Sequence, residues 1–246
     1  MTIAVIPSRF GSSRFEGKPL AMMAGKPMIQ RVYELAQASP EVSQTVVATD
    51  DQRIVAAVES FGGQALMTSA DCRSGTDRVA QTADILGLSE NDIIVNIQGD
   101  QPAFNPQVID ELIKPFSDEP GLNMSTLAFK IKDPREITDP KDVKVTFDQN
   151  GYALYFSRAQ IPFPRDEKTV VDYYKHLGFY AYTKSFLDIL VRLPSGTCEQ
   201  VEKLEQLRVI EFGHQIKIVI TEHDSPEIDL PEDISRFEPL FSKGRN

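Results

Sequence analysis

The sequence predicts a three-layer α/β sandwich with a mixed, mostly parallel sheet and an inserted β-hairpin subdomain. Two observations lead to this prediction. In the first part of the chain, apolar segments of strand length alternate with segments whose apolar residues recur at helical spacing. Further on, apolar runs flank the dipeptide Asn150-Gly151, which indicates an antiparallel hairpin. We expect one domain over residues 1–246, with the hairpin subdomain at about 123–182.

Length and composition narrow the class of protein. A chain of 246 residues can bury one substantial core, and 41% hydrophobic and 25% charged residues are ordinary for a soluble globular protein. The net charge of -10 argues against a nucleic-acid partner, which needs a basic face. Cys72 and Cys198 form no CxxC motif, so we expect free thiols in the reducing cytoplasm. No apolar segment is long enough to predict membrane insertion.

The first stretch of interest is IAVIPSRFGSSRFEGKPL, residues 3–20. It predicts a strand that breaks at Pro7, then a loop that carries the cations Arg9, Arg14 and Lys18, and a helix starting shortly after Lys26. In an acidic chain, this arrangement favours a polyanion site at the carboxyl end of a sheet over a solvated surface loop. The spacing of the glycines matches neither a P-loop nor a dinucleotide fingerprint, so side-chain charge should do most of the binding.

Two further segments follow predicted strands in the first half of the chain. Ser74 with Asp77 fits a capping box that opens a helix ending near Gly87. The apolar run Asp92–Ile97 predicts a central strand, and Asp100 follows it directly. A carboxylate there projects into the crevice at the strand ends, where a hard cation between phosphates would bind; the alternative is a turn or capping role.

The remaining elements are predicted from periodicity and punctuation. Strands are expected at 45–49, 65–67, 124–131, 143–147, 152–156, 174–182 and 216–220, and helices from Met28, after the cap Asp51, at 106–116, at 199–212 and from Pro231. The helix at 199–212 is strongly amphipathic, and its inward residues are expected to be Val201, Leu204, Leu207, Val209 and Ile210.

The segment PSRFGSSRFEGKPL resembles the signature of sugar nucleotidyltransferases that make CMP-activated acidic sugars, above all the 3-deoxy-manno-octulosonate (Kdo) cytidylyltransferase family. The likeness extends along nearly the whole chain through SGTDR, QGDQP, YFSRAQIPF, YKHLGFYAY, EQVEKLEQLR and SPEIDLPEDI. The chain departs from the family pattern at Ser8, Glu16, Gln101 and Leu230. The resemblance implies the nucleotide-diphospho-sugar transferase fold.

It also implies a reaction: transfer of CMP from CTP to the anomeric hydroxyl of Kdo or 8-amino-Kdo, with release of pyrophosphate, for lipopolysaccharide biosynthesis. The implied Mg²⁺ ligands are Asp100 and Asp229, which with Lys18 form the catalytic set. The implied nucleotide-binding residues are Arg9, Arg14, Lys18, Ser74, Gly75, Thr76, Arg78 and Gln98. The implied sugar-binding residues are Arg158, His176, Tyr180, Glu202 and Gln206. A homodimer is expected.

Several alternatives stay open at this point. His176 and the helix at 199–212 also fit purely structural roles, and the hairpin fits either a lid or a dimer contact. The segments QGDQP, YKHLGFYAY and HDSPEID look more like the 8-amino-Kdo subgroup. A CMP-sialate synthetase-like activity is a further enzyme alternative. A non-catalytic sugar-nucleotide binding protein is a third, although it would require the metal carboxylates or loop cations to be lost.

Overall fold

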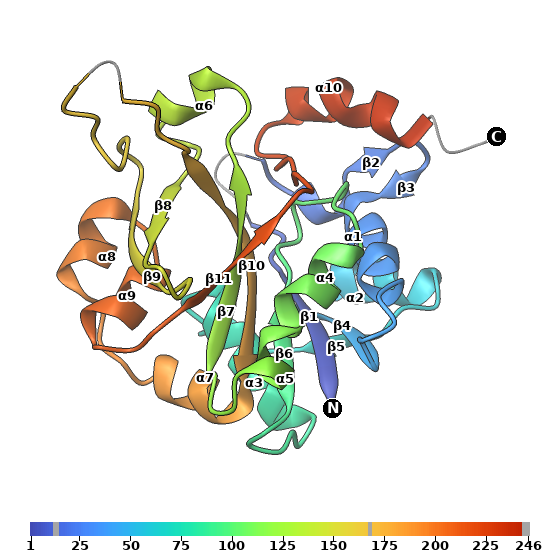
Figure 1. Ribbon diagram of the computed structural model, residues 1–246. Coiled ribbons are helices and arrows are strands. Elements are labelled where there is room, and N and C mark those ends of the chain that lie inside the picture. The colour runs from blue at the N-terminus through green and yellow to red at the C-terminus, as the bar shows by residue number, and fades with distance from the viewer. Residues whose placement is uncertain (12–14, 167–168, 243–246) are drawn as a thin grey trace. The chain divides into compact units, whose positions relative to one another are not determined.

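The computed structural model describes residues 1–11, 15–166 and 169–242. The chain forms two compact units, Met1–Asp110 with Ser225–Asn246 and the intervening Glu111–Asp224 (Figure 1). The stretch expected as the hairpin subdomain, about 123–182, lies within the second unit. Among the described residues, no helix is both long and apolar enough to cross a membrane.

The first unit contains a parallel sheet in the order β6-β1-β4-β5. Its strands are β1 (Thr2–Ser8), β4 (Gln44–Thr49), β5 (Ala65–Met67) and β6 (Ile93–Asn96). The side chains of Ile3 to Ile6 are all fully buried, as expected for a strand covered on both faces. Because β1 lies between β4 and β6, the strand order reverses beside β1, and the carboxyl ends of β1 and β6 form a topological switch point.

Helices and one short hairpin complete this unit. They are η1 (Lys18–Leu20), β2 (Met22–Met23), β3 (Lys26–Pro27), α1 (Met28–Gln37), α2 (Gln52–Ser60), α3 (Gly75–Ile85) and α10 (Pro231–Ser242). Asp51 caps α2 by accepting a hydrogen bond from Arg53 N, and Ser74 with Asp77 forms the predicted capping box of α3. Helix α4 (Gln107–Ile113) spans the position in the chain where the second unit begins.

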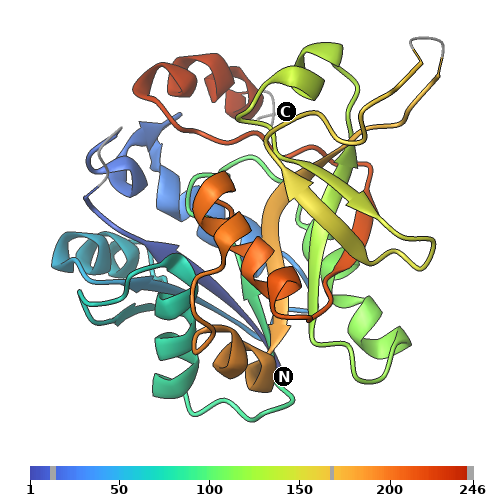
Figure 2. The same cartoon turned by 90° about the vertical axis from the view of Figure 1, so that its left-hand side faces the viewer.

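The second unit adds antiparallel pairing (Figure 2). Its strands are β7 (Met124–Lys130), β8 (Lys144–Phe147), β9 (Ala153–Ser157), β10 (Tyr174–Thr183) and β11 (Lys217–Thr221). Strand β11 pairs parallel to β7, whereas β10 pairs antiparallel to both β7 and β8. Its helices are α5 (Pro115–Asp118), α6 (Pro134–Thr138), α7 (Lys184–Leu190), α8 (Thr197–Glu202) and α9 (Gln206–Glu211). The predicted α/β class with a mixed, mostly parallel sheet is confirmed.

The predicted hairpin is confirmed as β8 and β9, with a loop longer than two residues. Gly151 has φ +78°, a left-handed conformation that favours glycine. Asp148 organises the loop, because its carboxylate accepts hydrogen bonds from Asn150 N (2.9 Å) and Tyr152 N (2.8 Å). The Asx-type turn, rather than the Asn-Gly dipeptide alone, therefore reverses the chain.

The prediction that the first strand breaks at Pro7 is wrong, since β1 continues to Ser8. Val5 O accepts a hydrogen bond from Ile97 N, so the backbone polar groups of Val5 face β6. Every second residue of a strand faces the same neighbour, so the nitrogen of Pro7 also faces β6. Strand β6 ends at Asn96, so no ladder partner is lost there. Pro7 keeps its register opposite Ala48 of β4, which explains why the strand tolerates it.

The prediction of one helix over 199–212 is also wrong, because the chain forms α8 and α9 with Lys203 in the left-handed region (φ +55°) between them. Arg208 of α9 pairs with Glu199, and Glu211 accepts hydrogen bonds from Cys198 N and Glu199 N of α8. These contacts require the two helices to fold back on each other. The break changes the helical phase, so Val201 is 78% exposed instead of inward-facing.

Loss of the α3 capping box should destabilise the protein. Ser74 Oγ accepts from Asp77 N (3.0 Å), and the Asp77 carboxylate accepts from Ser74 N (3.2 Å). We expect Ser74→Ala to lower the free energy of unfolding by about 1 kcal/mol in urea denaturation. The control Ser60→Ala removes an exposed hydroxyl that donates to Ala57 O. An equal loss in both variants would show that the capping box contributes nothing.

Candidate active site

The loop after β1 returns Lys18 to the switch point. Gly17 N donates to Phe10 O (2.9 Å), and Gly17, which directly precedes η1, has φ +69°, a conformation that other residues rarely adopt. A Cβ at this glycine would also lie 3.2 Å from the Phe10 ring. The loop thereby places Lys18 where its Nζ lies 2.8 Å from Asp100 Oδ2, just after β6. The cation and the carboxylate predicted from separate motifs are thus partners.

Asp229 reaches the same place from the C-terminal part of the chain. Ile228 N donates to Asp100 O (2.9 Å), and Lys18 Nζ donates to Ile228 O (2.9 Å). Lys18 Nζ also lies 3.7 Å from Asp229 Oδ1. The structure therefore brings together the three residues expected to form the catalytic set, from segments more than 120 residues apart in the case of Asp100 and Asp229.

Helix α10 anchors the segment that carries Asp229. The Asp233 carboxylate accepts from Asp229 N (3.0 Å) and Leu230 N (2.9 Å) at the start of this helix. Beyond it, an apolar cluster joins the helix to the N-terminal loop; its members are Met23, Met28, Ile228, Phe15, Ile234, Phe237 and Phe241. Arg31 of α1 lies over the Phe241 ring at 4.3 Å and donates to Met23 O and Ala24 O. The capping hydrogen bonds and this apolar packing together fix the position of Asp229.

A third carboxylate, Glu227, accompanies the pair. Gln101, which is fully buried, donates to Glu227 Oε1 at 3.3 Å. Desolvation raises the pKa of Glu227 to about 7, and the negative charges of Asp100 and Asp229 add to the rise. Part of Glu227 reaches the surface, so the charges of Asp100 and Asp229 act on it together with desolvation. The sequence motifs gave Glu227 no catalytic or metal role; the signal available was a second acid two residues before Asp229.

The donor set suits a magnesium ion. Among residues 1–11, 15–166 and 169–242, no cluster of three or more His, Cys, Asp or Glu side chains is arranged as a complete metal cage. Mg²⁺ bound together with a nucleotide needs fewer protein ligands, because one or two carboxylates suffice when phosphates and water supply the other oxygens. Asp100 and Asp229 already share one bound cation, the ammonium of Lys18, so their oxygens converge. The residues present therefore fit the predicted ion.

Several other residues expected to bind nucleotide lie around the same strand ends. Arg9 is exposed and donates to Cys72 O (2.6 Å), whereas Arg14 lies outside the described residues. Ser74 caps α3, Gly75 and Thr76 begin the helix, and a Cβ on Gly75 would lie 3.5 Å from Pro7 at the end of β1. Gln98 is half-buried between β6 and Asp100. A helix N-terminus this near the switch point is suited to an anion.

Arg78 has a different environment from the one expected. Its side chain is fully buried, and its guanidinium donates to Asp50 Oδ2 (2.8 Å) and to Thr68 Oγ1. Asp50 follows β4 and Thr68 follows β5, so Arg78 ties α3 to two strand ends. These contacts give Arg78 a structural role, and direct nucleotide binding by it stays a prediction.

In the second unit, Arg158 and Glu202 are partners. Glu202 accepts from Ser157 Oγ (2.6 Å) and Arg158 N (3.0 Å) through its carboxylate, and from Arg158 Nε (2.8 Å) through its backbone carbonyl. The guanidinium also donates to Pro140 O (2.9 Å). The left-handed Lys203 turns the chain away at this point, which leaves the Glu202 carbonyl open to Arg158. Glu202 therefore holds Arg158, and contact of either residue with a sugar stays a prediction.

His176 is a neutral hydrogen-bonding group. Its Nε2 lies 2.9 Å from Thr126 Oγ1, and its ring contacts Phe156 edge-on (5.1 Å) and Tyr180 (5.3 Å). Part of the residue reaches the surface, but burial of the ring lowers its pKa to about 3. Gln206 is buried on α9 in the same unit. The expected sugar-binding residues of the second unit thus comprise Arg158 with its partner Glu202, and three neutral groups, His176, Tyr180 and Gln206.

The parallel sheet with its switch point, the cationic loop and the carboxylate pair define a nucleotidyltransferase. Residues 3–218 match the cytidylyltransferase family model. The chain is 60% identical to a 3-deoxy-manno-octulosonate cytidylyltransferase of Desulfatibacillum aliphaticivorans, over 97% of this chain and 98% of that protein. It is 54% identical to an 8-amino-3,8-dideoxy-manno-octulosonate cytidylyltransferase of Shewanella frigidimarina, over 95% of this chain and 96% of that protein.

A solved structure of a CMP:2-keto-3-deoxy-manno-octonic acid synthetase complexed with CTP superposes with a TM-score of 0.92 at 40% identity, covering 98% of both chains. The chain belongs to the 3-deoxy-manno-octulosonate cytidylyltransferase family. The fold and the family expected from the sequence are therefore both confirmed.

The depressed pKa of His176 predicts how stability depends on pH. The pKa of its ring is about 3 in the folded chain, whereas an unperturbed histidine has a pKa of 6.5. Between these two pKa values, the unfolded chain binds more protons at this histidine than the folded chain does. The contribution of His176 to the free energy of unfolding is therefore fully present above about pH 6.5 and decreases as the pH is lowered. When the pH is lowered from about 7 to about 4.5, we expect the melting temperature of His176→Asn to fall by less than that of the wild type.

Thr126→Val removes the hydrogen-bond partner but keeps the histidine. This control should retain the pH dependence of the wild type. If His176→Asn and the wild type lose the same amount of melting temperature on acidification, the ring does not contribute to the pH dependence.

Proposed function

We propose that this chain transfers CMP from CTP to the anomeric hydroxyl of Kdo or 8-amino-Kdo and releases pyrophosphate, as a step of lipopolysaccharide biosynthesis. The observation that carries the proposal is the convergence of Lys18, Asp100 and Asp229 at the switch point of a parallel sheet. The names of the relatives, at 51–60% identity over nearly the whole chain, support this substrate class.

The residues of the chain divide the work in this proposal. Lys18, Arg9 and Arg14 neutralise the triphosphate, and the first turn of α3 supplies backbone donors. Asp100 and Asp229 hold Mg²⁺, which when bound neutralises charge on the phosphates and lowers the pKa of the attacking hydroxyl. The sugar oxygen forms a bond to the α-phosphorus as the bond to the β-phosphate oxygen breaks, and the hydroxyl proton goes to solvent. Catalysis is then mainly positioning and electrostatic stabilisation.

We also propose that the enzyme works as a homodimer in the cytoplasm. Large apolar side chains of the second unit are well exposed, including Leu154 (57%) on the hairpin, Phe163 (80%) and Val201 (78%), which supports burial against a second copy. The free thiols of Cys72 and Cys198 fit a reducing compartment. Light scattering during size-exclusion chromatography tests the dimer.

The other candidate functions have less support. A non-catalytic binding protein would need the carboxylate pair or the loop cation to be lost, and Lys18, Asp100 and Asp229 are all present and in contact. No specific observation among the described residues favours a CMP-sialate synthetase-like activity.

Neutralising either metal ligand should nearly abolish turnover. Asp100→Asn and Asp229→Asn each remove a charged oxygen ligand for a hard cation, so we expect at least a roughly 100-fold lower kcat in pyrophosphate release. The matched control is Asp118→Asn, which removes an aspartate from an exposed ion pair with Lys114. Circular dichroism checks that the variants fold. If a folded variant turns over within a few-fold of the wild type, that aspartate is not a metal ligand.

The choice of sugar has its own test. Kdo and 8-amino-Kdo differ at one end group, and selection of an ammonium requires a carboxylate within hydrogen-bond reach. We predict that the wild type accepts 8-amino-Kdo. Our candidate carboxylates are Glu202, Asp224 and Glu227. Glu202 already binds Arg158 N, and Asp224 pairs with Lys175 (3.0 Å), whereas Gln101 offers Glu227 only a neutral amide.

The measurement is kcat/KM for both sugars with the wild type, Glu202→Gln, Asp224→Asn and Glu227→Gln. We expect Glu202→Gln to weaken both sugars alike, because it loosens Arg158. Loss confined mainly to the amino sugar is expected for Asp224→Asn or Glu227→Gln. Efficient turnover of Kdo beside undetectable turnover of 8-amino-Kdo by the wild type would leave Kdo as the substrate.

A further inference from the structure

The ammonium of Lys18 lies among the same oxygens that are proposed to hold the metal ion. Lys18 Nζ is 2.8 Å from Asp100 Oδ2, 2.9 Å from Ile228 O and 3.7 Å from Asp229 Oδ1. Only 16% of its side chain is exposed, so the ion pair is largely shielded from water. The lysine is therefore held as a cation within the carboxylate pair in this structure.

This arrangement conflicts with simultaneous metal binding. Mg²⁺ requires its oxygen ligands at about 2.0–2.1 Å, and two cations a few ångströms apart repel strongly in a shielded site. The side chain of lysine is long and flexible, and it binds phosphate as a point charge. The ammonium can accordingly leave the carboxylates when another anion is offered to it.

We propose that Lys18 is the resident counter-ion of Asp100 and Asp229, and that a divalent cation binds this pair only by displacing the ammonium. The inference rests on the proposed function for the two metal ligands and goes beyond it by stating what occupies them beforehand. The triphosphate draws Lys18 away and vacates the carboxylate oxygens. Nucleotide and metal must then strengthen each other's binding, because each favours the arrangement that the other needs.

The charges around the pair explain why a counter-ion is needed. Asp100 Oδ2 and Asp229 Oδ1 lie 2.8 Å and 3.7 Å from the same ammonium, so two negative charges lie close together around it. Without the ammonium, the carboxylates would repel one another in the nucleotide-free enzyme. Lys18 thus keeps the ligand set assembled until the substrate arrives.

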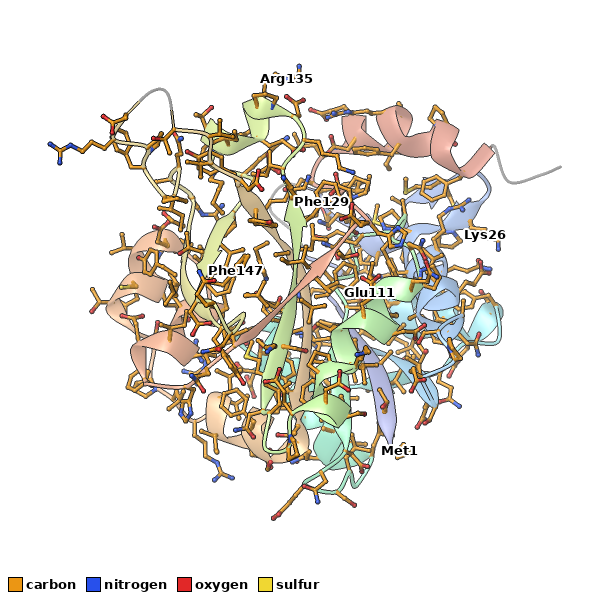
Figure 3. All side chains as sticks on the ribbon, viewed as in Figure 1. Met1, Lys26, Glu111, Phe129, Arg135 and Phe147 are labelled. Atoms are coloured by element: carbon orange, nitrogen blue, oxygen red, sulfur yellow. The ribbon has the colours of Figure 1, made fainter. Side chains whose placement is uncertain are left out.

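The main test measures Mn²⁺ affinity without nucleotide, by isothermal titration calorimetry or electron paramagnetic resonance. Lys18→Met keeps the apolar stem of the side chain and removes the competing charge. We expect Mn²⁺ to bind this variant at least about tenfold tighter than the wild type. A gain of this size corresponds to a wild-type site that is free of the ammonium about one-tenth of the time. The control Lys26→Met removes a lysine from an exposed pair with Glu34. Lys26 lies on β3 (Figure 3), and this variant should bind Mn²⁺ like the wild type.

A second measurement uses the unaltered chain and does not depend on the folding of a variant. Amine-reactive labelling of Lys18, followed by mass spectrometry, should be slow in the free enzyme and become faster as Mn²⁺ is added. Labelling of Lys26 should not respond. Unchanged Lys18 labelling at Mn²⁺ concentrations that saturate the protein would overturn displacement.

The double variant Lys18→Met with Asp100→Asn tests whether the gain comes from the vacated carboxylate, and wild-type activity separates this inference from the proposed function. It should lose the gain in Mn²⁺ affinity, because the gain requires the vacated carboxylate. If Lys18→Met gains affinity but the wild type releases no pyrophosphate from CTP with either sugar, the proposed function fails and the counter-ion role stands. If the wild type is active and Lys18→Met binds Mn²⁺ no tighter, the counter-ion role is wrong.

Discussion

The ion pair between Lys18 and Asp100 joins parts of the chain that nothing local brings together. The loop after β1, the segment after β6 and the stretch before α10 meet through one ammonium, which also binds the carbonyl of Ile228, 210 residues away. Such a partly buried pair contributes little net stability, but removing one partner leaves a costly uncompensated charge. Its value lies in fixing the position of three segments at the carboxyl ends of the strands.

The same principle recurs at other strand ends. Arg78 is fully buried and holds Asp50 after β4 and Thr68 after β5. In the second unit, Lys175 of β10 lies over Phe129 of β7 and pairs with Glu136 and Asp224. Removing the partner of such a buried cation is costly, because it leaves an uncompensated charge. The protein thus uses buried cations to secure segments that lie beside its strands.

Much of the fold could be predicted from local features. The run Ile3–Ile6 is apolar at every position, as a strand buried on both faces requires, and the Ser74–Asp77 capping box depends on residues three apart. The errors have long-range causes. Lys203 breaks the expected helix because Arg208 and Glu211 bind the start of α8. Pro7 stays within β1 because its missing N–H faces a position that β6 does not reach.

The sequence by itself determined the strands, the caps, the hairpin and the residue types of the site, because periodicity, capping and short motifs act over a few neighbouring residues. Only the tertiary structure decided which of these residues meet. It pairs Lys18 with both aspartates and places Glu227 beside them. It also buries Arg78 and brings Glu202 into hydrogen bonds with Arg158. Those outcomes depend on contacts between distant segments and on the burial that decides whether a charge faces a ligand or an internal partner, and neither can be read from local spacing.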